Sequence, residues 1–329
     1  MGDFESEPFS NVDSSDLLRI FAGRYLGFLK YATRYVRYAA LSLLYIENFW
    51  DVPRALFGKG AAVKIRGGKS YSLFGSYAPR ALYILLTTKQ AGWPLAISDD
   101  FESVSFPFAG RKMALVGYDC AALAGEVFFG GEYDRLLVKG RDVLDIGAYI
   151  GDTALLFSLR GAKKVVALEP FPSSYSRAKG NIEKNRLGRK ITLLNAGAGA
   201  KDSEMLVESS AQSSGGNQLR GSQKGMKVPL LSLKGISKKY GLSDAVLKMD
   251  CEGAEYGILL GTERGTLRNF RQIMLEYHYG YVNIREKLKS AGFEVSIIKP
   301  PGYTYNNGWS KPHARTGILL AERRGAVDE

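Results

Sequence analysis

The chain contains few of the residues that build covalent or metal-bound frameworks. Of its 329 residues, two are cysteines, Cys120 and Cys251, and two are histidines, His278 and His313. Two cysteines far apart in the sequence do not form a disulfide framework, and two histidines do not supply a histidine-rich zinc site. We therefore expect a reduced, intracellular protein.

Long apolar runs are also lacking. The longest covers residues 39–46 and is interrupted by Ser42, whereas a helix that crosses a bilayer needs about 20 apolar residues. The first residues, MGDFESE, are acidic and do not resemble a secretory signal. The sequence predicts a cytoplasmic protein without a transmembrane segment.

Positive charge is in excess, with 45 Lys and Arg against 33 Asp and Glu, a net charge of +12. Residues 177–239 hold thirteen of the basic residues and four of the acidic ones, which makes this segment a candidate RNA-binding surface. Hydrophobic residues make up 45% of the chain, which is typical of a globular protein.

The N-terminal part, residues 1–100, is expected to form a helical cap region. Within it, apolar residues at helical spacing predict a helix over 13–50 with a basic opposite face. This helix either packs on its own domain or lies on an anionic membrane surface or on RNA. A second helix is expected over 79–88.

Residues 101–138 are expected to form a small β element. Short apolar runs at 103–108, 112–118 and 125–129 predict three strands, separated near Gly110 and Gly125.

From residue 139 to 329, strands and helices alternate. Strands are predicted at 143–146, 165–169, 191–195, 245–250, 272–276, 293–298 and 316–323, and helices at 152–160, 174–185 and 284–292. This alternation predicts a doubly wound α/β domain with its ligands at the carboxyl ends of parallel strands. The Ser/Gly-rich stretch 208–225 is expected to be a mobile loop that closes over the bound substrate.

A nucleotide-type site is indicated where the first of these strands ends. Asp145 is followed by Gly147, Gly151 and a helix that begins at 152–153, and Glu169 ends the next strand. A carboxylate at the position of Glu169 suits the hydroxyl groups of a ribose. The G-x-G-x-x-G spacing is absent, and Asp145 would repel a pyrophosphate, so S-adenosylmethionine is favoured over a dinucleotide.

Several motifs together resemble the FkbM-type methyltransferases. They are VLDIGAYIGDT, LEP at Glu169, LLNAGAG, the block KMDCEGAE and IMLEYH, and the resemblance extends from about residue 125 to 323. It implies a class I, Rossmann-like methyltransferase domain with a seven-stranded sheet, S-adenosylmethionine as the donor, and usually O-methylation. Tyr149 stands where the family commonly has Asn.

By position, the resemblance assigns Asp145, Gly147 and Gly151 to the methionine part of the donor and Glu169 to the ribose. Asn195 and Ala196 are expected to border the adenine. The complete predicted cofactor-binding set is Asp145, Gly147, Tyr149, Gly151, Asp152, Thr153, Glu169, Asn195, Ala196 and Asp250.

Four ionisable residues at the ends of two later strands are the predicted catalytic set: Asp250, Glu252, Glu276 and His278. Residues two apart share one face of a strand, and neighbouring strands end side by side. An acceptor hydroxyl has to lose its proton, and the candidate base is His278 or a carboxylate with a raised pKa. His278 as a structural residue, and Asp250, Glu252 and Glu276 as ligands of Mg²⁺, remain open alternatives.

The predicted function is O-methylation of a hydroxyl on a sugar, a lipid-linked molecule or a natural product. The alternative is an RNA methyltransferase that uses the basic segment 177–239, although no N-P-P-Y-type block is present. A third alternative is a cofactor-binding scaffold protein without activity. The acceptor itself is expected to be selected by loops and by the N-terminal region.

Overall fold

The protein was analysed as a computed structural model, which describes residues 36–37, 39–57, 59–207, 225–304 and 313–323. Residues 13–35 of the predicted N-terminal helix and 208–224 of the predicted acceptor loop lie outside the described residues. The described chain divides into two compact units between Glu132 and Tyr133. The predicted boundaries at residues 100 and 138 remain predictions.

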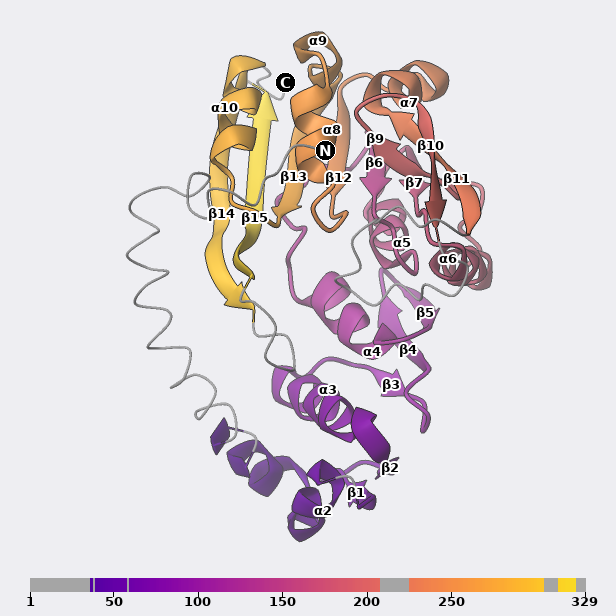
Figure 1. Cartoon of the computed structure of the whole chain (residues 1–329). Coiled ribbons are helices and arrows are strands. Elements are labelled where there is room, and N and C mark those ends of the chain that lie inside the picture. Colours follow the sequence, from indigo (N-terminus) through magenta and orange to yellow (C-terminus); the bar gives the residue numbers. More distant parts are fainter. Residues whose placement is uncertain (1–35, 38, 58, 208–224, 305–312, 324–329) are drawn as a thin grey trace. The chain divides into compact units, whose positions relative to one another are not determined.

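The unit up to Glu132 combines short helices with two small antiparallel sheets (Figure 1). One sheet is a hairpin of β1 and β2, and the other has the order β3-β4-β5. Its elements are η1 (Phe49–Asp51), α2 (Val52–Leu56), β1 (Ala61–Lys64), β2 (Ser70–Leu73), η2 (Gly75–Tyr77), α3 (Ala78–Ala91), β3 (Ala96–Ile97), β4 (Ser103–Phe108), β5 (Arg111–Val116), α4 (Cys120–Leu123) and η3 (Ala124–Phe129).

The helix predicted to reach residue 50 ends at Tyr45 in the described residues. Ile46 instead pairs with Ile65, and the side chain of Asn48 accepts from the backbone N–H of Lys64 and donates to the carbonyl of Ala62. An asparagine that binds backbone groups in this way competes with helical hydrogen bonding. The chain therefore turns at this point and pairs with β1.

The segment 125–129, predicted as a strand, is instead part of a π-helical turn, η3. A Cβ atom at Gly125 would lie 2.0 Å from the ring of Trp93, so this glycine allows the indole ring to pack directly on the backbone. The strand prediction was wrong because periodicity alone does not distinguish a short buried helical run from a buried strand, and Phe128 of this run is buried against Phe106 and Phe108 of β4.

The unit from Tyr133 onward contains the predicted doubly wound domain (Figure 1). The predicted strands and helices are all present, most of them within two residues of their expected ends. The elements are β6 (Asp142–Ile146), α5 (Asp152–Leu159), β7 (Lys164–Leu168), α6 (Pro172–Lys184), β8 (Ile191–Leu194), β9 (Gly197–Gly199), β10 (Ser203–Val207), β11 (Met226–Ser232), α7 (Leu233–Tyr240), β12 (Ala245–Met249), α8 (Glu255–Gly261), α9 (Arg264–Leu267), β13 (Phe270–Tyr277), α10 (Val282–Ser290), β14 (Phe293–Thr304) and β15 (His313–Arg323).

The main sheet has seven strands in the order β14-β15-β13-β12-β6-β7-β8. The pairs from β13 to β8 are parallel, and β15 runs antiparallel to both of its neighbours. The seven-stranded, doubly wound fold class predicted from the sequence is confirmed. A smaller sheet of order β10-β11-β9 lies in the same unit.

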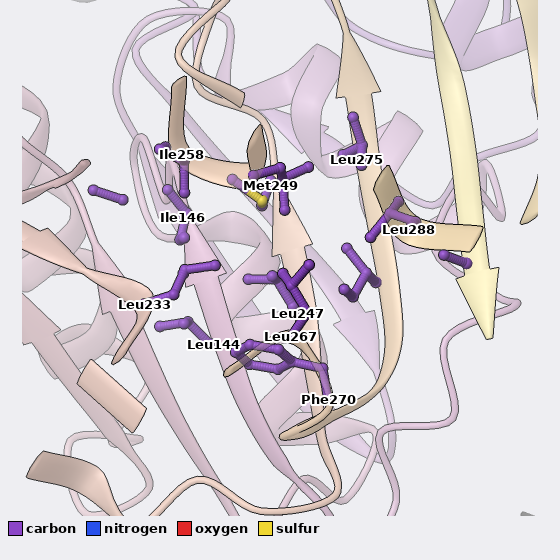
Figure 2. Packing of buried hydrophobic residues seen from close by; sticks show 14 of the residues in the cluster. Leu144, Ile146, Leu233, Leu247, Met249, Ile258, Leu267, Phe270, Leu275 and Leu288 are labelled. Atoms are coloured by element: carbon purple, nitrogen blue, oxygen red, sulfur yellow. The ribbon is translucent and has the colours of Figure 1, made fainter. Parts of the chain in front are cut away.

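A buried apolar cluster holds the central strands and helices α7 to α10 together (Figure 2). Alternate residues of β6 and β12 point into it, among them Ile146 and Met249 at the last positions of these strands. Both strands are completely buried, as expected for parallel strands covered on both faces. The core thereby fixes the residues that follow each strand, where the predicted site lies.

Candidate functional site

The predicted site residues follow neighbouring strands at one edge of the main sheet. Ile146, the last residue of β6, is in register with Met249 of β12 on one side and with Leu168 of β7 on the other. The backbone N–H of Asp250 donates to the carbonyl of Ile146 at 3.0 Å. The loops after β13, β12, β6, β7 and β8 consequently lie in a row, with His278, Asp250, Gly147, Glu169 and Asn195 in this order.

Gly147 is the point of closest approach between two of these loops. Its φ is +79°, and a Cβ atom there would lie 1.7 Å from the carbonyl oxygen of Asp250. The absence of a side chain is therefore required for the contact between the β6 and β12 loops, whether or not a ligand also approaches this glycine.

Asp145 takes part in a buried ion pair. Its Oδ1 lies 3.2 Å from Nζ of Lys248, and its Oδ2 accepts a hydrogen bond of 2.6 Å from the hydroxyl of Thr153. Lys248 also donates to the carbonyl of Gly147 at 2.8 Å. These contacts tie β6, β12 and the start of α5 together, and the assignment of Asp145 to the methionine part remains a prediction.

Glu169 holds the glycine-containing loop through its carboxylate. One oxygen accepts from the backbone N–H of Tyr149 at 2.8 Å, and the other accepts from that of Phe171 at 2.9 Å. Tyr149 has a φ of +46°, a conformation that costs energy in a residue other than glycine. Asn195 secures the next loop by donating to the carbonyls of Glu169 and Pro170.

The remaining predicted donor-side residues lie around the start of α5 and the end of β8. Gly151 is the N-cap of α5 with a φ of +85°, and no side chain caps this helix. Asp152 and Thr153 are buried in its first turn, while Ala196 is a buried residue of the apolar cluster. The uncapped N–H groups of a helix start are donors for an anionic group.

Negative charge is in excess along this edge. Burial raises the pKa of Asp152 and of Glu169 to about 7, and that of Asp250 to about 6. Lys248 is the cation that acts on all three of these carboxyls, and on Asp250 it acts together with His278. One lysine shared among several carboxyl groups leaves the edge suited to a ligand that carries positive charge.

The predicted alternation of Asp250 and Glu252 along a strand does not occur, because β12 ends at Met249. Residues 252–254 form a turn, and Glu252 has a φ of +56°. The turn is held by Glu255, whose fully buried carboxylate accepts from the backbone N–H of Cys251 at 2.8 Å and of Gly253 at 2.9 Å. Glu255 thus acts as an anchor of the turn that carries Asp250 and Glu252.

His278 lies between two carboxylates. Its Nε2 is 3.2 Å from Glu252, and its Nδ1 is 3.4 Å from Glu255, the second contact being an ion pair without hydrogen-bond geometry. Burial alone would lower the pKa of His278, but the two carboxylates outweigh this effect and raise the pKa to about 11. The imidazole ring is therefore protonated at neutral pH.

Asp250, Glu252 and His278 converge, since one ligand atom from each lies within 4.8 Å of the others. Glu276 is in β13, paired with Ile318 of β15, and does not belong to this group of three. The three side chains could hold a divalent ion only if the imidazole lost its proton, which the two carboxylates oppose.

Sequence reasoning missed the role of Lys248, and it interpreted Glu255 only as a cap of the helix that begins there. Lys248 stands inside the otherwise apolar strand AVLKM, and a lysine in a fully buried strand requires a charged partner. That signal was present in the sequence. The role of Glu255 depends on the path of the turn and has no comparable signal.

Residues 145–295 match a protein-family model described as the methyltransferase FkbM domain. This confirms the resemblance stated from the sequence motifs. A comparison with curated protein sequences finds no relative. In the described residues, no helix is both long and apolar enough to cross a membrane.

Among solved structures, the chain is similar to a precorrin-6y C5,15-methyltransferase from Geobacter metallireducens, with 15% identity, 62% of this chain and 87% of that chain covered, and a TM-score of 0.34. The METTL16 methyltransferase domain shows 14% identity, 88% and 92% coverage and a TM-score of 0.40. TrmK from M. capricolum, in complex with S-adenosyl-homocysteine, shows 11% identity, 57% and 65% coverage and a TM-score of 0.37.

Proposed function

We propose that the protein transfers the methyl group of S-adenosylmethionine to a hydroxyl group, because residues 145–295 match the model of the methyltransferase FkbM domain. The acceptor class is a sugar, a lipid-linked molecule or a natural product. The observation that carries the proposal is Asp250, a carboxylate with a pKa of about 6, beside the His278 imidazolium at the carboxyl edge of the sheet.

The residues present fit S-adenosylmethionine as the donor. Its sulfonium and ammonium groups would offset the excess negative charge of Asp152 and Glu169. Each oxygen of Glu169 accepts one backbone N–H and retains a lone pair that a ribose hydroxyl can use. The uncapped start of α5 supplies N–H donors for the amino-acid carboxylate.

In this proposal, S-adenosylmethionine supplies an electrophilic methyl group, and the chain aligns the acceptor and removes its proton. Asp250 accepts the hydroxyl proton, because a carboxylate with a pKa of about 6 is largely ionised at neutral pH yet basic enough to take a proton in the transition state. Lys248 and His278 keep Asp250 ionised by their positive charges, and Glu252 and Glu255 keep His278 protonated. This assigns the base to a carboxylate, one of the two options that the sequence left open.

The experiment that tests this function is a transfer screen with S-adenosylmethionine labelled on its methyl group. Cell extract separated into RNA, lipid, glycan and small-molecule fractions serves as the source of acceptors. Label in a lipid, glycan or small-molecule fraction supports the proposal if it is stable to conditions that cleave esters and is absent with Asp250→Asn. Label in RNA would instead support the alternative, which rests on the basic segment 177–239.

A cytoplasmic location is part of the same proposal. It is supported by the two free cysteines, Cys120 and Cys251, which a reducing compartment keeps reduced. Detection of the protein by cell fractionation, with markers for each compartment, tests it directly.

A further inference from the structure

Exposed apolar side chains are concentrated in one short part of the chain. Of the nine large hydrophobic side chains that are exposed in the described residues, six lie between residues 36 and 74. Their exposed fractions reach 73% for Trp50 and 82% for Phe57. The six residues, here called the apolar tip, are Val36, Leu43, Leu44, Trp50, Phe57 and Phe74.

The apolar tip belongs to one folded piece of chain, not to separate loops. The backbone N–H of Arg66 donates to the carbonyl of Tyr45, and its guanidinium donates to that of Leu43, so the end of the first helix is fixed to the β1–β2 hairpin. A Cβ atom at Gly60 would lie 2.4 Å from the ring of Phe74, which places that ring over the start of β1. The side chains of the apolar tip are therefore exposed on a folded region of the chain.

Basic residues accompany the apolar tip. Residues 36–74 contain six Lys and Arg against two Asp and Glu, a net charge of +4 in 39 residues. Arg54 and Lys59 flank Phe57 in the chain and are exposed, and both acidic residues are already engaged, Glu47 with Lys64 and Asp51 with Asn48. The basic residues are Arg37, Arg54, Lys59, Lys64, Arg66 and Lys69.

We propose that the apolar tip, with its basic residues, binds peripherally to the surface of an anionic lipid bilayer. Insertion of tryptophan and phenylalanine side chains into the interfacial layer is energetically favourable, and anionic head groups attract nearby Lys and Arg side chains. The occupant is a bilayer and not RNA, because Val36, Leu43 and Leu44 are aliphatic and have no ring to stack on bases. The membrane contact expected for the helix 13–50 is thereby assigned to residues 36–74.

The test is flotation of the full-length protein with vesicles of phosphatidylcholine alone or mixed with phosphatidylserine, at about 0.1 M salt. The protein is expected to float with the mixed vesicles and to be released as salt rises. Trp50→Ser combined with Phe57→Ser should weaken binding at least tenfold, because burial of these rings drives insertion. Failure to float with either vesicle would overturn the proposal.

Charge is tested separately from apolar contact. Arg54→Gln with Lys59→Gln should weaken binding to the mixed vesicles about 25-fold, since each basic residue near an anionic surface contributes about 1 kcal/mol. The matched control is Lys179→Gln with Lys184→Gln, two exposed lysines of α6, and it should bind as the parent does. Equal loss in both pairs would show that net charge alone is responsible and would overturn the assignment to the tip.

Two measurements separate a bilayer from other occupants. Brominated lipids should quench the fluorescence of the parent more than that of Trp50→Phe, which removes one of the three tryptophans and keeps an apolar ring. Analytical ultracentrifugation should give the same mass for the parent and for the Trp50→Ser, Phe57→Ser variant. A parent dimer that this variant dissociates would assign the tip to a second copy of the chain. RNA that displaces the protein from vesicles would assign the tip to nucleic acid.

Discussion

The proposed donor side and the proposed acceptor side of the sheet edge use their charged residues in different ways. On the donor side, Asp145 and Glu169 are buried, and their partners are Lys248, Thr153 and backbone N–H groups. On the acceptor side, His278 and Glu252 remain partly exposed and are partners of each other. The donor-side carboxylates are thus tied to the fold by buried partners, whereas Glu252 and His278 on the acceptor side form a partly exposed pair of opposite charges.

This difference predicts that donor-side substitutions alter stability and donor binding, and that acceptor-side substitutions alter turnover and its pH dependence. The predictions below test that division, beginning with the largest expected effect.

Lys248→Met is expected to lower the free energy of unfolding by about 3–5 kcal/mol, because Asp145 and its neighbours then lose their buried cation. Chemical denaturation measures this loss. The penalty should shrink from about pH 8 to about pH 5, since Asp152 and Glu169, with pKa values of about 7, become protonated as pH falls.

The control for this substitution is Lys234→Met, which removes an exposed lysine paired with Glu263. An exposed pair of this kind contributes about 1 kcal/mol or less. Similar losses for Lys234→Met and Lys248→Met would contradict the structural role of the buried pair.

Asp250→Asn is expected to lower kcat about 10²-fold or more while donor affinity stays within a few-fold of the parent. In the parent, activity should fall as pH drops below about 6, because Asp250 is then protonated. His278→Gln removes a positive charge beside Asp250 and thereby raises the pKa of Asp250. The fall in activity at low pH should therefore begin at a higher pH. The pH–rate profiles of the three proteins measure these shifts.

A base role for His278 makes a different forecast for the same profiles. With a pKa of about 11, a histidine base would make the activity of the parent rise up to that pH instead of reaching a plateau above about 6. If the fall in activity at low pH is lost in His278→Gln but retained in Asp250→Asn, the base is His278.

Glu169→Ala is expected to weaken donor binding by about 1–3 kcal/mol, because ribose hydroxyls and two backbone N–H groups lose their acceptor. Glu169→Gln keeps one oxygen and should lose less. Calorimetry should also show parent affinity falling as pH drops below about 7, since protonation of Glu169 removes negative charge that favours the cationic donor. Unchanged affinity in Glu169→Ala would refute the ribose assignment.

Glu276→Gln is expected to have the smallest effect, a change in kcat of less than about 5-fold, because Glu276 is outside the group formed by Asp250, Glu252 and His278. Steady-state kinetics on the purified variant measures it. A loss as large as that of Asp250→Asn would restore Glu276 to the catalytic set.

The sheet and the identity of the loops that form the edge followed from sequence, because buried parallel strands are continuous apolar runs with glycines and helices between them. The pairing of charges did not follow. Whether Glu252 faces His278 depends on a turn with a φ of +56°, and a strand pattern contains no information about that turn. The hairpin of β1 and β2 was missed as well, since its short strands alternate too few residues to stand out.

The absence of a side chain at Gly147 has a consequence for exchanging parts between methyltransferases. The β6 and β12 loops touch backbone to backbone, so one cannot be replaced without the other fitting it. A foreign segment should replace residues 250–255 only if the protein from which it is taken also has glycine at the position equivalent to Gly147. The β6 and β12 loops therefore have to be exchanged together. Specificity for a new acceptor is more readily engineered by changing segments outside these two loops.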